Sequence, residues 1–142
     1  PDIFAVGDCT SHPNSLLGRR VRLESVHNAQ EQAKTAALAL LDKAQPYAQI
    51  PWFWSDQYDL KLQIVGLAEP GNVRIVRGDP ASRSFAVFYM DGTRLVATEA
   101  VNRAREFMLS KKLIAAGARL DPAAVADDKL DFKALAEQAL AA

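Results

Sequence analysis

The stretch SFAVFYMDGTRLVATEAV, residues 84–101, decides the fold of this chain. Two runs rich in Val, Phe and Ala, residues 84–90 and 93–101, flank the pair Asp91-Gly92. A two-residue turn between antiparallel strands needs positive φ angles, which glycine adopts without steric cost. The stretch therefore predicts a β-hairpin.

Two further apolar runs precede this hairpin. Residues 60–67 and 73–77 are rich in Leu, Ile and Val, and Gly/Pro turn signals follow them at residues 70–71 and 78–80. Short strands joined by short turns pair with their neighbours along the chain. The four runs together predict an antiparallel meander.

Two helices are expected after the meander. Residues 103–116 place apolar side chains at helical spacing, and Gly117 is a typical C-terminal stop. A last helix over residues 131–140 has Asp131 as its N-cap. The predicted fold class is α+β, an antiparallel β-sheet meander with two covering helices.

The N-terminal segment has a different pattern. Residues 3–6 form a short apolar run typical of a strand buried on both faces, residues 9–20 are loop-like, and residues 23–41 predict a helix. The apolar stripe of that helix is mostly alanine, which predicts close packing against another backbone. A strand and one helix cannot bury their own surfaces, and the chain begins at Pro1 just before the strand. We therefore expect the sequence to be a fragment of a longer protein.

Composition excludes several classes of protein. The 142 residues include 17 Lys and Arg against 17 Asp and Glu, and this balance argues against a dedicated nucleic-acid binder. No apolar run reaches the roughly 18 residues that a membrane helix needs. A single cysteine forms no internal disulfide, which favours a cytoplasmic location.

Asp8 is the first candidate for a binding residue. It follows the predicted strand, and open α/β sheets bind ligands at the carboxyl ends of their strands. The helix start near residues 23–26 would add unpaired N–H groups and partial positive charge. The alternatives are a strand-ending turn at Asp8 and a plain amphipathic helix.

The string PWFWSDQ, residues 51–57, fits neither a helical nor a strand period. Clustered tryptophans outside a periodic element often cover a ligand, a cofactor edge or an interface. The alternative is a hydrophobic plug between two subdomains.

Other kinds of chemistry lack support. Cys9, His12 and His27 are too few for a closed zinc site, so no metal is expected. The glycines form no dinucleotide fingerprint, and no nucleophile elbow is present. Between residues 103 and 119, five basic side chains face one acid, which indicates either a docking patch for an acidic partner or a solvated helix face.

Several long strings together resemble one family. They include IFAVGDC (residues 3–9), RRVRLESVHNAQEQAKTAA (19–37), PWFWSDQYDLKLQIVGL (51–67) and AVNRAREFMLSKKLI (100–114). In this order they are similar to the C-terminal third of FAD-dependent NADH:ferredoxin reductases, the family of the putidaredoxin, rhodocoxin and dioxygenase-system reductases.

The resemblance implies a domain division and a cofactor site. Residues 1–48 would be the C-terminal remnant of an FAD-binding α/β domain, and residues 49–142 the reductase C-terminal α+β domain. Asp8 would hold the ribityl chain of FAD, and the backbone of Val26 would approach the pyrimidine end of the flavin. Trp54 would lie close to the isoalloxazine and act as the catalytic residue on the path of the leaving electrons.

The resemblance also implies partners. Electrons would pass from NADH through FAD to a 2Fe–2S ferredoxin that serves an oxygenase, with Lys34, Lys111 and Lys133 facing the acidic ferredoxin. Both nucleotide fingerprints of the family are missing here, so the isolated chain is expected to be inactive and to retain no FAD. Self-association is expected through the uncovered N-terminal segment, and no nucleic acid or membrane partner is expected.

Two alternatives remain. The chain could belong to a related FAD/NAD(P) reductase with another acceptor, such as a quinone or dioxygen. It could also be a non-catalytic module for dimerisation or docking.

Overall fold

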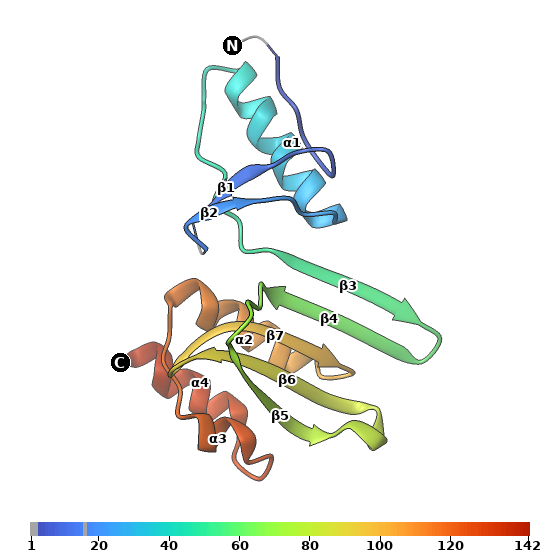
Figure 1. Cartoon of the computed structure of the whole chain (residues 1–142), viewed down its shortest axis with the longest axis vertical. Coiled ribbons are helices and arrows are strands. Elements are labelled where there is room, and N and C mark those ends of the chain that lie inside the picture. The colour runs from blue at the N-terminus through green and yellow to red at the C-terminus, as the bar shows by residue number, and fades with distance from the viewer. Residues whose placement is uncertain (1–2, 16) are drawn as a thin grey trace. The chain divides into compact units, whose positions relative to one another are not determined.

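The computed structural model describes residues 3–15 and 17–142, and the chain divides into two compact units, Pro1–Phe53 and Trp54–Ala142 (Figure 1). The elements, in chain order, are β1 (His12–Asn14), β2 (Arg19–Val21), α1 (Val26–Leu40), β3 (Trp52–Gln57), β4 (Leu60–Gly66), β5 (Val73–Asp79), the 3₁₀ helix η1 (Pro80–Ser82), β6 (Ser84–Asp91), β7 (Arg94–Val101), α2 (Ala104–Ala116), α3 (Pro122–Ala126) and α4 (Phe132–Ala141).

The second unit is built on a five-stranded sheet of order β3-β4-β7-β6-β5. Strands β6 and β7 form the predicted hairpin, in which Asp91 pairs with Arg94 and Gly92 adopts a φ of +59° in the turn. The antiparallel sheet, the hairpin and the α+β class are therefore confirmed. The expected meander order is wrong for one strand, because β4 pairs with β7 and not with β5, its successor in the chain. β7 lies between β4 and β6, so the hairpin is the centre of the sheet.

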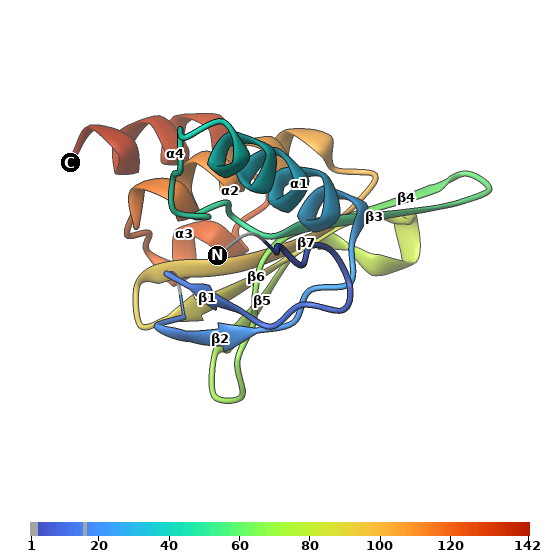
Figure 2. The ribbon, with the colours of Figure 1, turned by 90° about the horizontal axis from the view of Figure 1, so that it is seen from above.

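One face of this sheet carries the apolar core. Val65, Thr98, Phe88 and Ile75 lie in one row across four strands, and all four are buried. The ring of Phe132 in α4 packs on Phe88 with centroids 4.9 Å apart. Figure 2 shows α2 and α4 on the same side of this sheet.

The helix ends of the second unit follow local rules. Gly117 ends α2 in the left-handed region with a φ of +62°, and Asp131 caps α4 by accepting a hydrogen bond from the amide of Lys133. Both predictions are confirmed. The short helix α3 was not expected, although its start has a clear signal: Asp121 caps it and Pro122 follows.

Two predictions for the first unit are wrong. Residues 3–6 form no strand, and the side chain of Ile3 is 90% exposed. A strand exists only where another strand takes its hydrogen bonds, and none of the described residues pairs with this run. Conversely, the expected loop over residues 9–20 contains β1 and the start of β2, an antiparallel ribbon in which His12 pairs with Val21.

The helix α1 begins as expected but buries a different face. Asn28 and Gln32 are its buried residues, whereas Val26 and Leu40 of the predicted stripe are 54% and 67% exposed. The segments that cover α1 within this unit carry polar groups, and the buried polar residues of the helix form hydrogen bonds with these groups. The predicted close packing of the alanine face against another backbone holds only at Ala29, which lies against Gly7, whereas Ala33 and Ala37 are exposed.

The string at residues 51–57 also differs from expectation, because residues 52–57 form strand β3. β3 is an edge strand of the sheet, and its residues are half-buried or exposed. An edge strand without a buried face needs no apolar alternation, which explains why periodicity missed it.

Candidate functional site

The N-terminus of α1 is set by Ser25. Its backbone is extended, and its hydroxyl accepts a hydrogen bond from the amide of Asn28 at 3.1 Å. The amide of Val26 precedes this capped position and lies at the open end of the helix, where the helix dipole is positive. The side chain of Val26 is exposed. This helix end has the polarity to receive an electron-rich edge of a ligand.

The loop that carries Asp8 is attached to the same helix. The amide of Gly7 donates to Oε1 of Gln32 at 2.7 Å, and the hydroxyl of Thr10 lies 2.9 Å from the same oxygen. Gly7 has a φ of +84°, and a Cβ added to it would lie 3.6 Å from Cβ of Ala29. The backbone before Asp8 therefore lies against α1, one turn from Val26.

The carboxylate of Asp8 is exposed, and it makes no hydrogen bond or ion pair within the part of the chain that the structure describes. An unpaired carboxylate has acceptor sites for ligand hydroxyls, and the nearby helix end supplies N–H donors. Hydroxyls and an electron-rich ring edge are what a flavin nucleotide presents. The chemistry of Asp8 and Val26 therefore fits the expected cofactor, and Gly7, next to Asp8, lies against Ala29, one turn along α1 from Val26.

Polar contacts continue behind the loop. Nε2 of Gln32 lies 2.9 Å from Nδ1 of His12, and the ring of Tyr47 packs edge-on against His12 at 4.9 Å between centroids. The hydroxyl of Tyr47 donates to Oδ1 of Asn28 at 3.1 Å. Burial and the nearby charge of Arg20 lower the pKa of His12. Burial, with a smaller effect from Glu31, raises the pKa of Tyr47.

Sequence reasoning did not single out Gln32, Asn28 or Tyr47. The one available signal was the placement of Asn28 and Gln32 four residues apart in an alanine-rich helix, which puts two amide side chains on one helix face.

The predicted electron-path residue lies in the second unit. Trp54 is on the edge strand β3 and is 42% exposed. Trp52 belongs to the first unit, where its ring lies 5.3 Å from that of His27. The exposed indole of Trp54 is accessible to a ligand or a partner.

The three candidate docking lysines lie on helices. Lys34 on α1 pairs with Glu31 at 2.5 Å, and Lys133 on α4 lies 3.6 Å from Glu137. Lys111 lies on α2 and is half-buried. Lys34 belongs to the first unit and the other two to the second.

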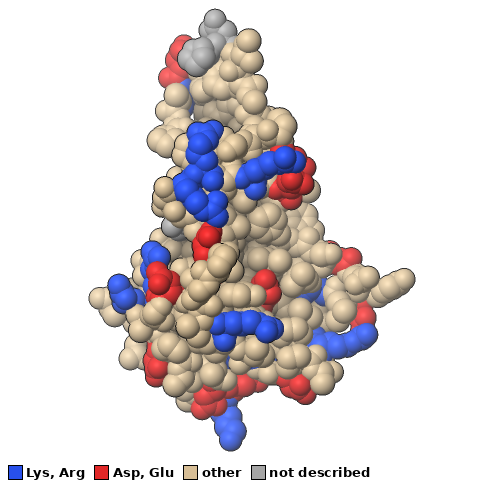
Figure 3. All heavy atoms as spheres, viewed as in Figure 1, with Lys and Arg blue, Asp and Glu red and all other residues tan. Residues whose placement is uncertain are grey.

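The basic stretch at residues 103–119 is only partly a surface patch. Arg103 pairs with Glu106 and Asp128, both at 3.0 Å, and Arg119 donates to the hydroxyl of Thr93 at 3.1 Å. On the face in Figure 3, basic and acidic side chains are interspersed over residues 54–142. The structure thus turns much of the predicted docking patch into intramolecular contacts.

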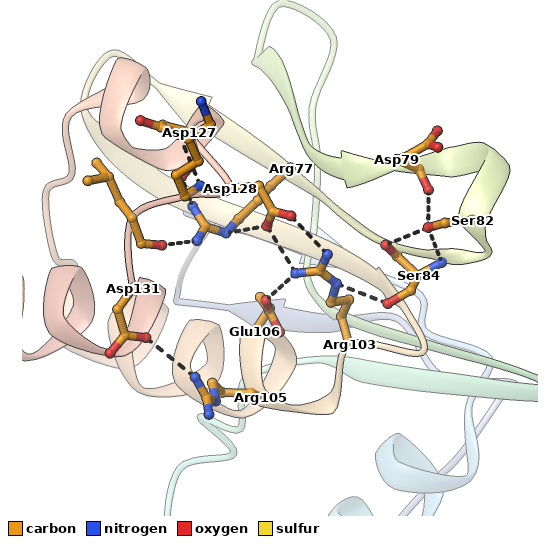
Figure 4. Close-up of polar contacts among 12 residues, drawn as sticks. Arg77, Asp79, Ser82, Ser84, Arg103, Arg105, Glu106, Asp127, Asp128 and Asp131 are labelled. Atoms are coloured by element: carbon orange, nitrogen blue, oxygen red, sulfur yellow. Dashed lines mark hydrogen bonds and ion pairs between the residues drawn. The ribbon is translucent and has the colours of Figure 1, made fainter.

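A buried arginine lies at the centre of these contacts. Arg77 on β5 is 3% exposed, and its guanidinium donates to the carbonyl oxygens of Val125, Asp127 and Leu130 (Figure 4). Nε of Arg77 lies 3.4 Å from a carboxylate oxygen of Asp128. Hydrogen bonding to Arg103 lowers the pKa of Asp128. The arrangement fastens the segment between α3 and α4 to the sheet.

The described residues form neither a metal cluster nor a membrane-spanning helix. They contain no group of three or more His, Cys, Asp and Glu side chains placed to hold a metal ion. Among them there is also no helix that is both long and apolar enough to cross a membrane.

Comparison with known proteins gives consistent matches. The Reductase C-terminal family matches residues 52–136. The chain is 47% identical over 136 residues to the 5,5'-dehydrodivanillate O-demethylase ferredoxin reductase subunit of Sphingobium sp., covering 95% of this chain and 33% of that protein. It is 44% identical over 133 residues to putidaredoxin reductase CamA of Pseudomonas putida, covering 94% and 32%.

A solved structure agrees. The covalent putidaredoxin reductase–putidaredoxin complex matches with a TM-score of 0.92 and 42% identity, over 100% of this chain and 34% of that one. The chain spans about a third of the length of the curated relatives it matches.

Proposed function

Because this chain belongs to the Reductase C-terminal family, we propose that it is the C-terminal region of a flavoprotein that passes electrons from NADH through FAD to a ferredoxin. The relatives are ferredoxin reductases, several of them in oxygenase systems, which is the family that the sequence strings predicted. The 2Fe–2S type of the ferredoxin and the use of NADH belong to this proposal.

The observation that carries the proposal is the attachment to α1 of the loop that carries Asp8. Gly7 donates to Gln32 and lies against Ala29, one turn from the start of the helix, and the exposed carboxylate of Asp8 has no partner among the described residues. In the proposed site Asp8 would accept hydrogen bonds from the hydroxyls of the ribityl chain. The amide of Val26 would lie toward the pyrimidine end of the flavin, where the helix dipole favours negative charge.

The cofactor, when bound, supplies the hydride-accepting and one-electron-donating chemistry. The residues of this chain bind and orient it. Trp54, exposed on β3, would cover the side from which electrons leave and exclude water there. Lys34, Lys111 and Lys133 would steer the acidic ferredoxin, a long-range effect that salt weakens.

A chimera tests the proposal. The chain replaces the matching third of putidaredoxin reductase of Pseudomonas putida, and the purified chimera is examined for flavin absorbance at about 450 nm and for NADH-dependent reduction of putidaredoxin. We expect both. A chimera that folds without flavin, or that holds flavin but reduces only quinones or dioxygen, would contradict the proposal.

Matched variants test the role proposed for each residue. Asp8→Asn in the chimera should lower flavin retention, whereas Asp42→Asn, the same change at an exposed position of the same unit, should not. Trp54→Ala should slow electron transfer to the ferredoxin more than it lowers flavin retention. Replacing the three docking lysines by Gln should raise the KM for the ferredoxin and leave kcat unchanged.

A further inference from the structure

Gln32 is a buried residue of the first unit to which the proposed function assigns no role. It is 7% exposed, and its amide contacts three residues of the loop that carries Asp8. The distances are 2.7 Å from Oε1 to the amide of Gly7, 2.9 Å from Oε1 to the hydroxyl of Thr10, and 2.9 Å from Nε2 to Nδ1 of His12.

These contacts fix the orientation of the Gln32 amide. The amide of Gly7 is a donor only, so the atom that faces it must be the carbonyl oxygen. The NH₂ group then faces His12 and donates to Nδ1, which leaves the ring proton of neutral His12 on Nε2, a buried atom with no hydrogen-bond partner among the described residues. A flipped amide would set two donors against each other at Gly7, and a buried donor without an acceptor is costly.

The same contacts fix the position of Asp8. Gly7 precedes it, adopts a φ of +84°, and lies against Ala29 on α1. Among the described residues, the hydrogen bonds that join residues 7–12 to α1 all go to Gln32. Without the side chain of Gln32, the loop keeps its internal turn, in which the amide and the hydroxyl of Thr10 reach the carbonyl of Gly7 at 3.0 and 2.8 Å. It also keeps its link to β2, through the pairing of His12 with Val21 and the hydrogen bond from Arg20 to the carbonyl of Ser11, but neither of these contacts holds it on α1.

We propose that Gln32 is the positioning residue of the cofactor site: its amide holds the Gly7–His12 loop on α1 and so fixes the backbone next to Asp8, one turn from the start of the helix. The assignment of a cofactor to Asp8 rests on the proposed function, whereas the link between Gln32 and the loop does not. His12 sets the direction of the Gln32 amide.

The role of His12 makes the attachment sensitive to protonation. A protonated ring has a proton on Nδ1 and can no longer accept the bond from Gln32. The groups that face His12 are Arg20 on β2, the ring of Tyr47, and Gln32 on α1, while Glu31 acts on Tyr47. The positive charge of Arg20 disfavours protonation of the nearby His12 ring, so the loop stays attached at neutral pH.

The test uses NMR on the isolated 142-residue chain, without any cofactor. Three variants are compared: Gln32→Ala, which removes the amide; Gln32→Glu, which keeps the oxygen acceptors and loses the donor; and Gln30→Ala, an exposed glutamine of the same helix, as the control. The readouts are hydrogen exchange of the Gly7 amide, the nuclear Overhauser contact from Gly7 to the methyl group of Ala29, and the tautomer of His12.

Gln32→Ala should speed exchange of the Gly7 amide by about tenfold and abolish the contact to Ala29. Gln32→Glu should preserve both, move the ring proton of His12 to Nδ1, and raise its pKa, because a carboxylate can only accept. Gln30→Ala should change none of these. A residue that only stabilised the helix would give the same loss in both Gln32 variants and no change of tautomer.

The outcomes separate this inference from the proposed function. An unaltered Gly7 amide and Ala29 contact in Gln32→Ala would overturn the positioning role, whatever the cofactor. If Gln32→Ala does not fold, the tautomer of His12 in Gln32→Glu still decides, because an unchanged Nε2–H tautomer contradicts the assigned bonds. If the Gln32 variants behave as expected but Asp8→Asn leaves flavin retention in the chimera unchanged, the proposed function fails and the positioning of the loop stands.

Discussion

The two units of the chain bury opposite kinds of side chain. In residues 54–142 the buried residues of the sheet and helices are overwhelmingly apolar, with Phe88, Leu113 and Val125 among the most completely enclosed. Among the described residues of 1–53, the buried polar residues are Thr10, His12, Asn14, Asn28 and Gln32, against the apolar side chains of Val21, Leu23 and Pro51.

This difference predicts which kinds of substitution destabilise each unit most. Apolar burial is non-directional and scales with area, so a sheet core tolerates small shifts. A buried polar network depends on direction, and a group left without a partner costs about 1–3 kcal/mol. The second unit should therefore fail through packing and backbone geometry, and the first through single lost hydrogen bonds.

The largest effect should come from Gly66→Ala in the second unit. Gly66 has a φ of +77°, and an added Cβ would lie 2.1 Å from the carbonyl oxygen of Val96. Backbone strain and overpacking together should lower the free energy of unfolding by about 4 kcal/mol, measured by urea denaturation with circular dichroism.

Gly71→Ala is the matched control for this prediction. Gly71 also has a positive φ, of +99°, but nothing lies within 4 Å of its added Cβ. Gly71→Ala should therefore lower the free energy of unfolding only through conformational strain, by about 1 kcal/mol. Equal losses in the two variants would show that the close approach to Val96 is not what constrains the sheet.

Arg77→Met tests the contribution of one buried polar residue to the stability of the otherwise apolar second unit. The substitution leaves the carbonyls of Val125, Asp127 and Leu130 without this donor and should cost about 3 kcal/mol. Amide hydrogen exchange should rise across residues 121–131. Arg74→Met, an exposed arginine on the same strand, serves as the control, and a similar loss there would remove the distinction between the two positions.

The units also differ in what the sequence could predict. In the second, turn residues such as Gly92 and Gly117 and the cap Asp131 marked the element ends, because those positions obey local backbone rules. In the first, the run at residues 3–6 has strand composition but no partner strand among the described residues. A segment forms a strand only when another segment pairs with it, and the local sequence does not show whether such a partner exists.

The candidate site shows the same limit. Asp8 could be found from its place after an apolar run, and Val26 from the helix start. Gln32 could not, because its role depends on three residues that lie 25, 22 and 20 positions away in the sequence. The roles of Asp8, Val26 and Trp54 toward a cofactor came from family resemblance and stay predictions.

Ser25→Ala tests whether the first unit depends on single hydrogen bonds. The hydroxyl of Ser25 caps α1 by accepting from the amide of Asn28, and its loss should cost about 1 kcal/mol, measured by thermal unfolding. The exposed Ser15 gives the control Ser15→Ala, which should be neutral. A neutral result for Ser25→Ala would mean that the network behind α1 holds the helix end without its cap.

The smallest effect should be a pH dependence confined to the first unit. The pKa of folded His12 lies below its ordinary value of 6.5, because burial and Arg20 disfavour the charged ring. As pH falls through 6.5, the unfolded chain binds a proton that the folded chain does not, so the free energy of unfolding decreases until the folded pKa is passed.

Above pH 6.5 the contribution of neutral His12 is fully present. Urea denaturation of the wild-type chain and of His12→Gln over this pH range measures the difference between them, which should shrink only on the acid side. The carboxylate of Asp128 acts in a separate window, because its folded pKa lies below 3.8 and its stabilisation is lost only as pH falls through that lower range. If His12→Gln kept the full slope below pH 6.5, the buried ring would not be the group that links the first unit to pH, and the polar network would have to be held by its amides alone.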